Sequence, residues 1–123
     1  MNRQGIALVV LLPLAMTANA SEYGEVLRKA DGMQRALGPE QKIGLSKATT
    51  GEMKAVMNVC EEEVGKMPPG MGVVFEIDAD GAVTQTWTRN STDYEQCFAE
   101  TMAARIDYEP PEAPFYASMD YGR

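Results

Sequence analysis

Histidine is absent from the 123 residues of the chain. Without an imidazole, no Ser/His or Cys/His catalytic pair and no His-ligated zinc or copper site can form. Positive charge is also scarce, because 11 Lys and Arg stand against 18 Asp and Glu and leave a formal net charge of −7. A chain this acidic, with no basic cluster, is poorly suited to a phosphate backbone, so no nucleic acid is expected as a partner.

The chain also lacks an apolar run long enough to span a membrane. The longest, residues 6–16, covers 11 positions and is interrupted by Pro13, whereas a spanning helix needs roughly 20. A basic residue precedes this run and Ala18-Asn19-Ala20 follows it, which is typical of a secretory signal peptide. We therefore expect residues 1–20 to be removed and residues 21–123 to fold as one small periplasmic domain, or a released one.

Cysteine occurs only twice, at Cys60 and Cys97. In an oxidising compartment such a pair normally becomes a disulfide, and here only one pairing exists. A redox-active pair is the alternative, but 37 positions separate the two residues, unlike the two-residue spacing that tunes thiol reactivity. The pair is therefore predicted to be structural.

Two helices are expected before the first strand. Residues 21–37 place apolar side chains at helical spacing and end at Gly38-Pro39, which suits a helix C-terminus. Residues 39–50 are expected to form a connector. A capping box at residues 49–52 then opens a second helix that ends near Gly65, with the first cysteine on its buried face.

A β-hairpin is predicted from two alternating segments, residues 73–77 and 82–89. Its turn contains a glycine that supplies a positive φ and aspartates that accept backbone hydrogen bonds. An EF-hand interpretation fails because Trp87 stands where the twelfth loop position requires Glu. The predicted turn residues are Asp78, Asp80 and Gly81.

The rest of the chain predicts a third helix and a final strand. Thr92 and Glu95 form a capping box, the second cysteine lies on the buried face of the helix that follows, and residues 115–121 alternate as a strand. The connections then give the sheet order second, first, last, all antiparallel. The expected fold is α+β and two-layered, with helices on a three-stranded antiparallel sheet and an extra N-terminal helix.

From Gly44 onward the chain resembles the TonB C-terminal domain family, in particular its AgmX/PglI-type branch. The resemblance rests on the order and spacing of short motifs: Gly44-Leu45-Ser46-Lys47, Cys60, residues 75–83 as the hairpin, Asn90-Ser91-Thr92, Cys97, and residues 106–111 near a Trp-x-Phe-Pro-x-Pro pattern. It implies an αββαβ domain over residues 44–123, preceded by the helix and connector of residues 21–43. It also implies an association with envelope energy transduction, here without a membrane anchor.

The same resemblance implies a binding function without catalysis. The last strand is a sheet edge, which a protein either protects or uses to pair with another chain. We expect a non-enzymatic adaptor that pairs a partner segment in the cell envelope, or a second copy of itself, with no catalytic residue, metal or cofactor. The predicted partner-binding residues are Phe115, Tyr116, Ala117, Ser118, Met119 and Asp120.

Two other functions compete with strand addition. Seven methionines remain after residue 20, and thioethers are suitable ligands for Cu(I). Most of them fall on predicted core faces, where methionine is an adaptable filler. Inhibition of an envelope enzyme is the third hypothesis, although no exposed reactive loop can be named. The methionines are Met33, Met53, Met57, Met67, Met71, Met102 and Met119.

Overall fold

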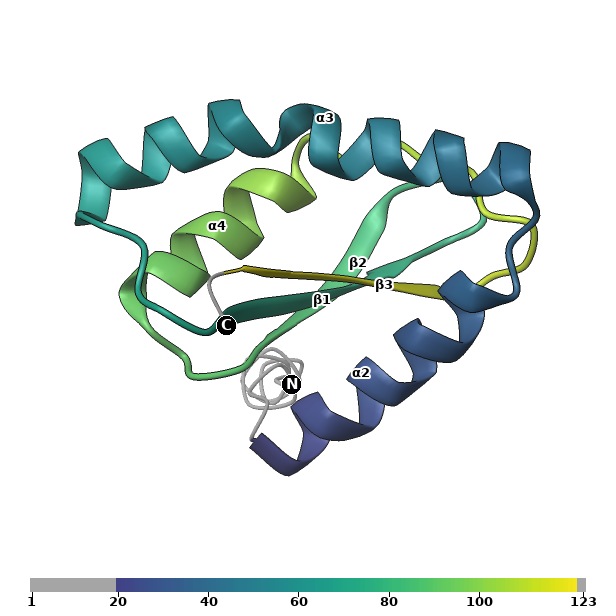
Figure 1. Cartoon of the computed structure of the whole chain (residues 1–123), viewed down its shortest axis with the longest axis horizontal. Coiled ribbons are helices and arrows are strands. Elements are labelled where there is room, and N and C mark those ends of the chain that lie inside the picture. The colour runs from purple at the N-terminus through teal and green to yellow at the C-terminus, as the bar shows by residue number, and fades with distance from the viewer. Residues whose placement is uncertain (1–19, 122–123) are drawn as a thin grey trace, which may run out of the picture.

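The computed structural model describes residues 20–121, so the predicted signal peptide lies outside the described residues except for Ala20. Three helices and one three-stranded antiparallel sheet with strand order β2-β1-β3 make up this part of the chain (Figure 1). The expected α+β class, with helices packed on a three-stranded antiparallel sheet, and the expected strand order are confirmed, but the sheet has helices on both faces and not on one. The elements are α2 (Ala20–Arg35), α3 (Pro39–Val64), β1 (Met71–Ile77), β2 (Val83–Thr88), α4 (Asp93–Ala103) and β3 (Phe115–Tyr121).

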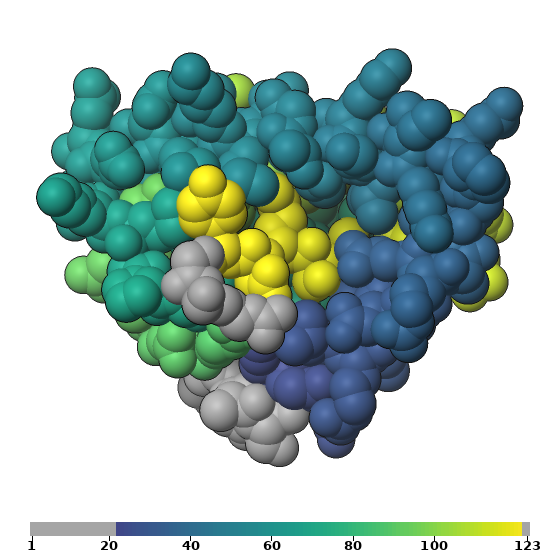
Figure 2. Space-filling view, viewed as in Figure 1, coloured from purple at the N-terminus to yellow at the C-terminus, as the bar shows by residue number. Residues whose placement is uncertain are grey.

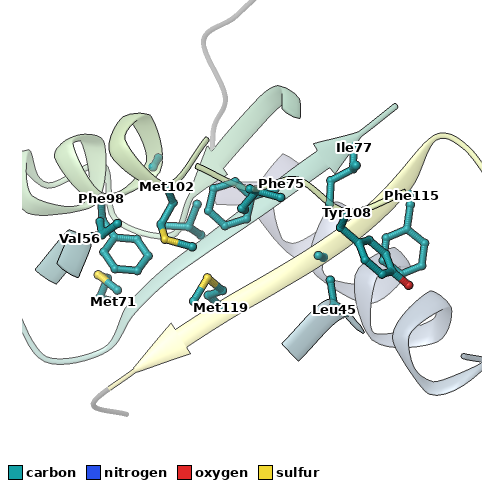
Figure 3. Packing of buried hydrophobic residues seen from close by; sticks show 14 of the residues in the cluster. Leu45, Val56, Met71, Phe75, Ile77, Phe98, Met102, Tyr108, Phe115 and Met119 are labelled. Atoms are coloured by element: carbon teal, nitrogen blue, oxygen red, sulfur yellow. The ribbon is translucent and has the colours of Figure 1, made fainter. Parts of the chain in front are cut away.

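The sheet is covered on both faces. Alternate side chains of β1, including Phe75 and Ile77, enter a large core with α3, α4 and β3 (Figure 3). Val74, which precedes Phe75, lies on the opposite face with Trp87 and the helix α2. The N-terminal helix therefore adds a third layer beneath the sheet, whereas α3 and α4 lie above it (Figure 1).

Two aromatic contacts hold α2 on this second face. Tyr23 is buried beside Gly72, where an added Cβ would collide with the tyrosine hydroxyl. The Arg89 guanidinium carbon lies 5.5 Å from the centre of the Tyr23 ring. Burial raises the pKa of the Tyr23 phenol, and the positive charge of Arg89 lowers it by a smaller amount. Strand β1 has no side chain at position 72 because the helix occupies that space.

The predicted connector at residues 39–50 is wrong, because α3 begins at Pro39 and runs without a break to Val64. Proline suits the first helical turn, where an N–H has no intrahelical partner to lose. Gly44 is tolerated because the ring of Tyr108 packs against it. The capping box predicted at residues 49–52 is also wrong, since Thr49 lies inside the helix and donates its hydroxyl to the Leu45 carbonyl at 2.9 Å.

Other local predictions are confirmed. The helix ends at Gly65, whose φ is 107°. In the hairpin turn, the Asp78 carboxylate accepts the N–H groups of Asp80 at 2.9 Å and Ala82 at 3.0 Å. Gly81 has the positive φ that the turn requires, 91°. These residues form a turn and organise the hairpin.

Glu95 fixes the junction between the sheet and α4. Its fully buried carboxylate accepts N–H groups from Gly72 at 3.0 Å, Asn90 at 3.0 Å and Thr92 at 3.1 Å. The Thr92 hydroxyl accepts the Glu95 N–H in return, which confirms the predicted capping box. One side chain therefore satisfies donors from the start of β1, the end of β2 and the start of α4.

The two cysteines are joined, as predicted. Cys60 of α3 and Cys97 of α4 form a disulfide with their Cα atoms 5.8 Å apart. The bond fixes the two helices that cover the first face of the sheet. None of the helices in the described part of the chain combines the length and apolarity needed to cross a bilayer.

Candidate binding groove at the edge of strand β3

The hydrogen-bond register identifies which backbone groups of β3 point away from the sheet. The Gly72 carbonyl accepts the Arg89 N–H at 2.9 Å. The backbone N–H and C=O groups of alternate residues of β1, starting from Gly72, therefore point toward β2. The backbone groups of Val73 and Phe75 consequently point toward β3, where these residues pair with Met119 and Ala117. In an antiparallel ladder both backbone groups of a residue point the same way. The backbone groups directed outward from β3 therefore belong to Tyr116, Ser118 and Asp120.

This outer edge lies in a recess between two helices. Figure 2 shows residues of β3, in yellow, at the bottom of a hollow with α3 above and α2 below. We call this hollow the β3 groove, formed by the outer edge of β3 and the facing sides of α2 and α3. Such a recess restricts access to the edge because the two helices form walls on both sides of it.

One edge donor already has a partner inside the molecule. The N–H of Ser118 donates to Oε1 of Gln34, on α2, at 3.0 Å. The Nε2 atom of Gln34 donates in turn to the Ser118 hydroxyl at 3.3 Å. A carboxamide has the same donor and acceptor groups as a peptide unit. Gln34 therefore occupies a hydrogen-bonding position that the peptide unit of an added strand would take.

The predicted partner-binding side chains divide into two sets. Those of Phe115, Ala117 and Met119 are buried in the large core, so they are not available to a partner. The other three face α2 and are half-buried, and they belong to Tyr116, Ser118 and Asp120. A partner at this edge would therefore meet mainly backbone groups of β3.

Tyr116 illustrates how the α2 face of β3 is fixed. Its ring lies 5.8 Å from that of Trp87, and the Lys29 ammonium sits 5.2 Å from the ring centre. Its hydroxyl donates to the Glu76 carboxylate at 3.1 Å. Burial raises the pKa of the Tyr116 phenol, and the Glu76 carboxylate raises it further. These contacts fix the face of β3 that packs on α2.

The groove ends in a pocket of about 370 Å³ where α2 meets α3. Leu37 and Leu45, both buried, contribute its apolar surface. A second pocket joins Leu37 to Phe115, so this end of the groove corresponds to the beginning of β3. The remaining lining residues are polar or charged: Asp31, Gln34, Arg35, Lys42, Ser46, Thr49 and Thr50.

The structure offers no carboxylate or thiolate metal cluster in the described chain. Within residues 20–121, no three Cys, Asp or Glu side chains lie close enough together to hold a metal ion. The methionines considered for Cu(I) are distributed through the core. Met71, Met102 and Met119 are buried, whereas the other four are half-buried against the core: Met33, Met53, Met57 and Met67.

Sequence reasoning missed Gln34 and the pocket. Gln34 lies 84 positions before Ser118, and no local pattern links a helical glutamine to a strand so distant. The residues of α3 that line the pocket fall in the segment expected to be a connector, so their helical positions were not foreseen. The glycine at position 72 was the available signal that α2 packs closely on the sheet.

A scan of family models and searches of curated proteins and of solved structures found no match to this chain.

Proposed function

We propose that the chain is a non-enzymatic periplasmic adaptor of the TonB C-terminal type that binds an extended polypeptide by strand addition at β3. The observation that carries this proposal is the register of β3, which directs the backbone groups of alternate residues away from the sheet and into the groove. Main-chain hydrogen bonds give affinity in this recognition mode, whatever the partner's side chains are.

The recess favours a single extended segment over a second folded copy. A second copy pairing through its own β3 would bring its own α2 and α3 on either side of that edge. Those helices would meet the helices that form the walls of the groove here. An isolated strand carries no such walls.

In this proposal the partner displaces Gln34. The Ser118 N–H donates to the Gln34 side chain in the free protein and to a carbonyl of the added strand in the complex. The intramolecular bond protects an edge that would otherwise pair indiscriminately. It also lowers the apparent affinity, because the bond must break before the partner's bond forms.

Strand addition is tested by comparing how much partner protein the wild type and two variants capture from an envelope extract. Ser118→Pro removes an outward donor, and Thr86→Pro is its matched control, because Thr86 lies opposite Phe75 on the other edge strand and also points outward. We expect Ser118→Pro to recover much less of any captured partner, and Thr86→Pro to recover as much as the wild type. Equal recovery by all three proteins, each folded by circular dichroism, would count against pairing at β3.

A further inference from the structure

The pocket at the end of the β3 groove is lined by two exposed cationic residues, Arg35 and Lys42. Arg35 ends α2 and Lys42 is the fourth residue of α3, and both residues line the pocket. Neither side chain makes a hydrogen bond or an ion pair with another residue in the described range, 20–121. The pocket therefore presents unused positive charge on a protein whose formal net charge is −7.

Two hydroxyls on α3 add donors to the same pocket. Ser46 and Thr50 line it, and neither makes a side-chain hydrogen bond within the described part of the chain. Thr49, between them, already donates to the Leu45 carbonyl. Asp31 is the one carboxylate of the lining, so the three ionised side chains carry a net charge of one positive unit. This donor set suits an anionic ligand group with hydrogen-bond acceptors.

The direction of β3 determines which end of a bound peptide reaches the pocket. β3 starts at Phe115, near the end of the groove where α2 meets α3, and runs away from that end. An antiparallel added strand runs the opposite way, so its C-terminus arrives at the pocket. A parallel strand would instead place its N-terminal ammonium beside Arg35 and Lys42, which like-charge repulsion disfavours. The observed sheet is antiparallel throughout.

We propose that the β3 groove binds the free C-terminus of an extended polypeptide, antiparallel to β3, with its terminal carboxylate in the Arg35–Lys42 pocket. This inference rests on the proposed strand addition and specifies the partner further. β3 has seven residues, so a tail of roughly that length spans the edge. The last side chain of the tail would contact the apolar surface that Leu37 and Leu45 contribute.

Random decapeptides displayed with free C-termini provide the probe. Binders selected on the purified protein are synthesised in two forms, as the free acid and as the C-terminal amide, and their Kd values are measured. Loss of a charge-assisted hydrogen bond makes us expect the amide to bind about ten-fold more weakly. Lys42→Gln and Arg35→Gln should each weaken the free acid and leave the amide unchanged. Lys54→Gln is the matched control, because Lys54 is exposed on α3 and does not line the pocket.

The outcomes separate this inference from the proposed function. Equal Kd values for acid and amide, with binding still abolished by Ser118→Pro, overturn the carboxylate pocket and leave strand addition intact. The inference is also overturned if the selected peptides carry an internal Asp or Glu, and if neutralising that residue weakens binding more than amidating the C-terminus does. If no decapeptide binds, both proposals fail. A preference for the acid that disappears in Lys42→Gln and persists in Lys54→Gln supports the pocket.

Discussion

The bond between Gln34 and Ser118 can be tested in the free protein, without any partner. Gln34→Ala removes both hydrogen bonds to Ser118 and leaves the alanine on a helix that tolerates it. A net intramolecular hydrogen bond contributes about 1 kcal/mol. Gln34 is only half-buried, so water competes with it and the second bond, at 3.3 Å, adds little. The expected loss of stability is therefore about 1 kcal/mol.

Amide hydrogen exchange followed by NMR measures this effect at a single site. The same 1 kcal/mol corresponds to about a five-fold faster exchange of the Ser118 amide in Gln34→Ala. The Tyr116 amide points the same way but makes no hydrogen bond within the described residues, so it should exchange rapidly in both proteins. Ser118→Ala is the matched control, because it loses the hydroxyl and keeps the N–H bond to Gln34.

The same variant should also bind peptide more tightly. If the partner must displace Gln34, the wild type spends part of the binding free energy on breaking the Gln34–Ser118 bond. Gln34→Ala has no such bond to break, so it should bind a selected peptide about five-fold more tightly. An unchanged Ser118 exchange rate in Gln34→Ala would refute the protective role of the bond. Weaker peptide binding by this variant would place Gln34 among the groups that hold the ligand.

Three further predictions concern the fold that supports the groove. Reducing the bond between Cys60 and Cys97 should lower the free energy of unfolding by about 4 kcal/mol in the chain-entropy model for a loop of 38 residues, and urea denaturation with and without reductant measures the loss. Glu95→Ala should cost on the order of 3 kcal/mol, because three N–H groups lose a buried acceptor; Glu95→Gln, which keeps an acceptor oxygen, should cost less. Stability should also fall above about pH 10, because the raised pKa of Tyr23 keeps its phenol protonated in the folded state while the unfolded chain loses its proton. Tyr23→Phe should reduce this alkaline slope in denaturation curves, and an unaltered slope would show that Tyr23 does not cause it.

The features that local chemistry determines could be predicted from the sequence. The turn at Asp78 and Gly81 and the capping box of Thr92 and Glu95 are formed by residues close together in the chain. The strand order followed from the chirality and length of the connections. The disulfide could be predicted because two cysteines allow only one pairing. Each of these signals is contained in a few residues or in a topological rule.

What could not be predicted depends on distant packing. Pro39 and Gly44 are helix breakers by local propensity, but the ring of Tyr108 packs on Gly44 and the helix continues. The position of α2 depends on the space that Gly72 leaves for Tyr23. The contact of Gln34 with the edge requires that α2 already lie beneath the sheet. The groove is therefore a tertiary feature, and its lining residues carry no local signature.

Hydrogen exchange with bound peptide shows whether an extended segment pairs with β3. Amide exchange is compared for the free protein and for the protein saturated with a selected decapeptide. We expect strong new protection of the Tyr116 amide and no change at Thr86 on the opposite edge. Protection at Thr86, or on the helices alone with Tyr116 still exchanging freely, would contradict pairing at β3.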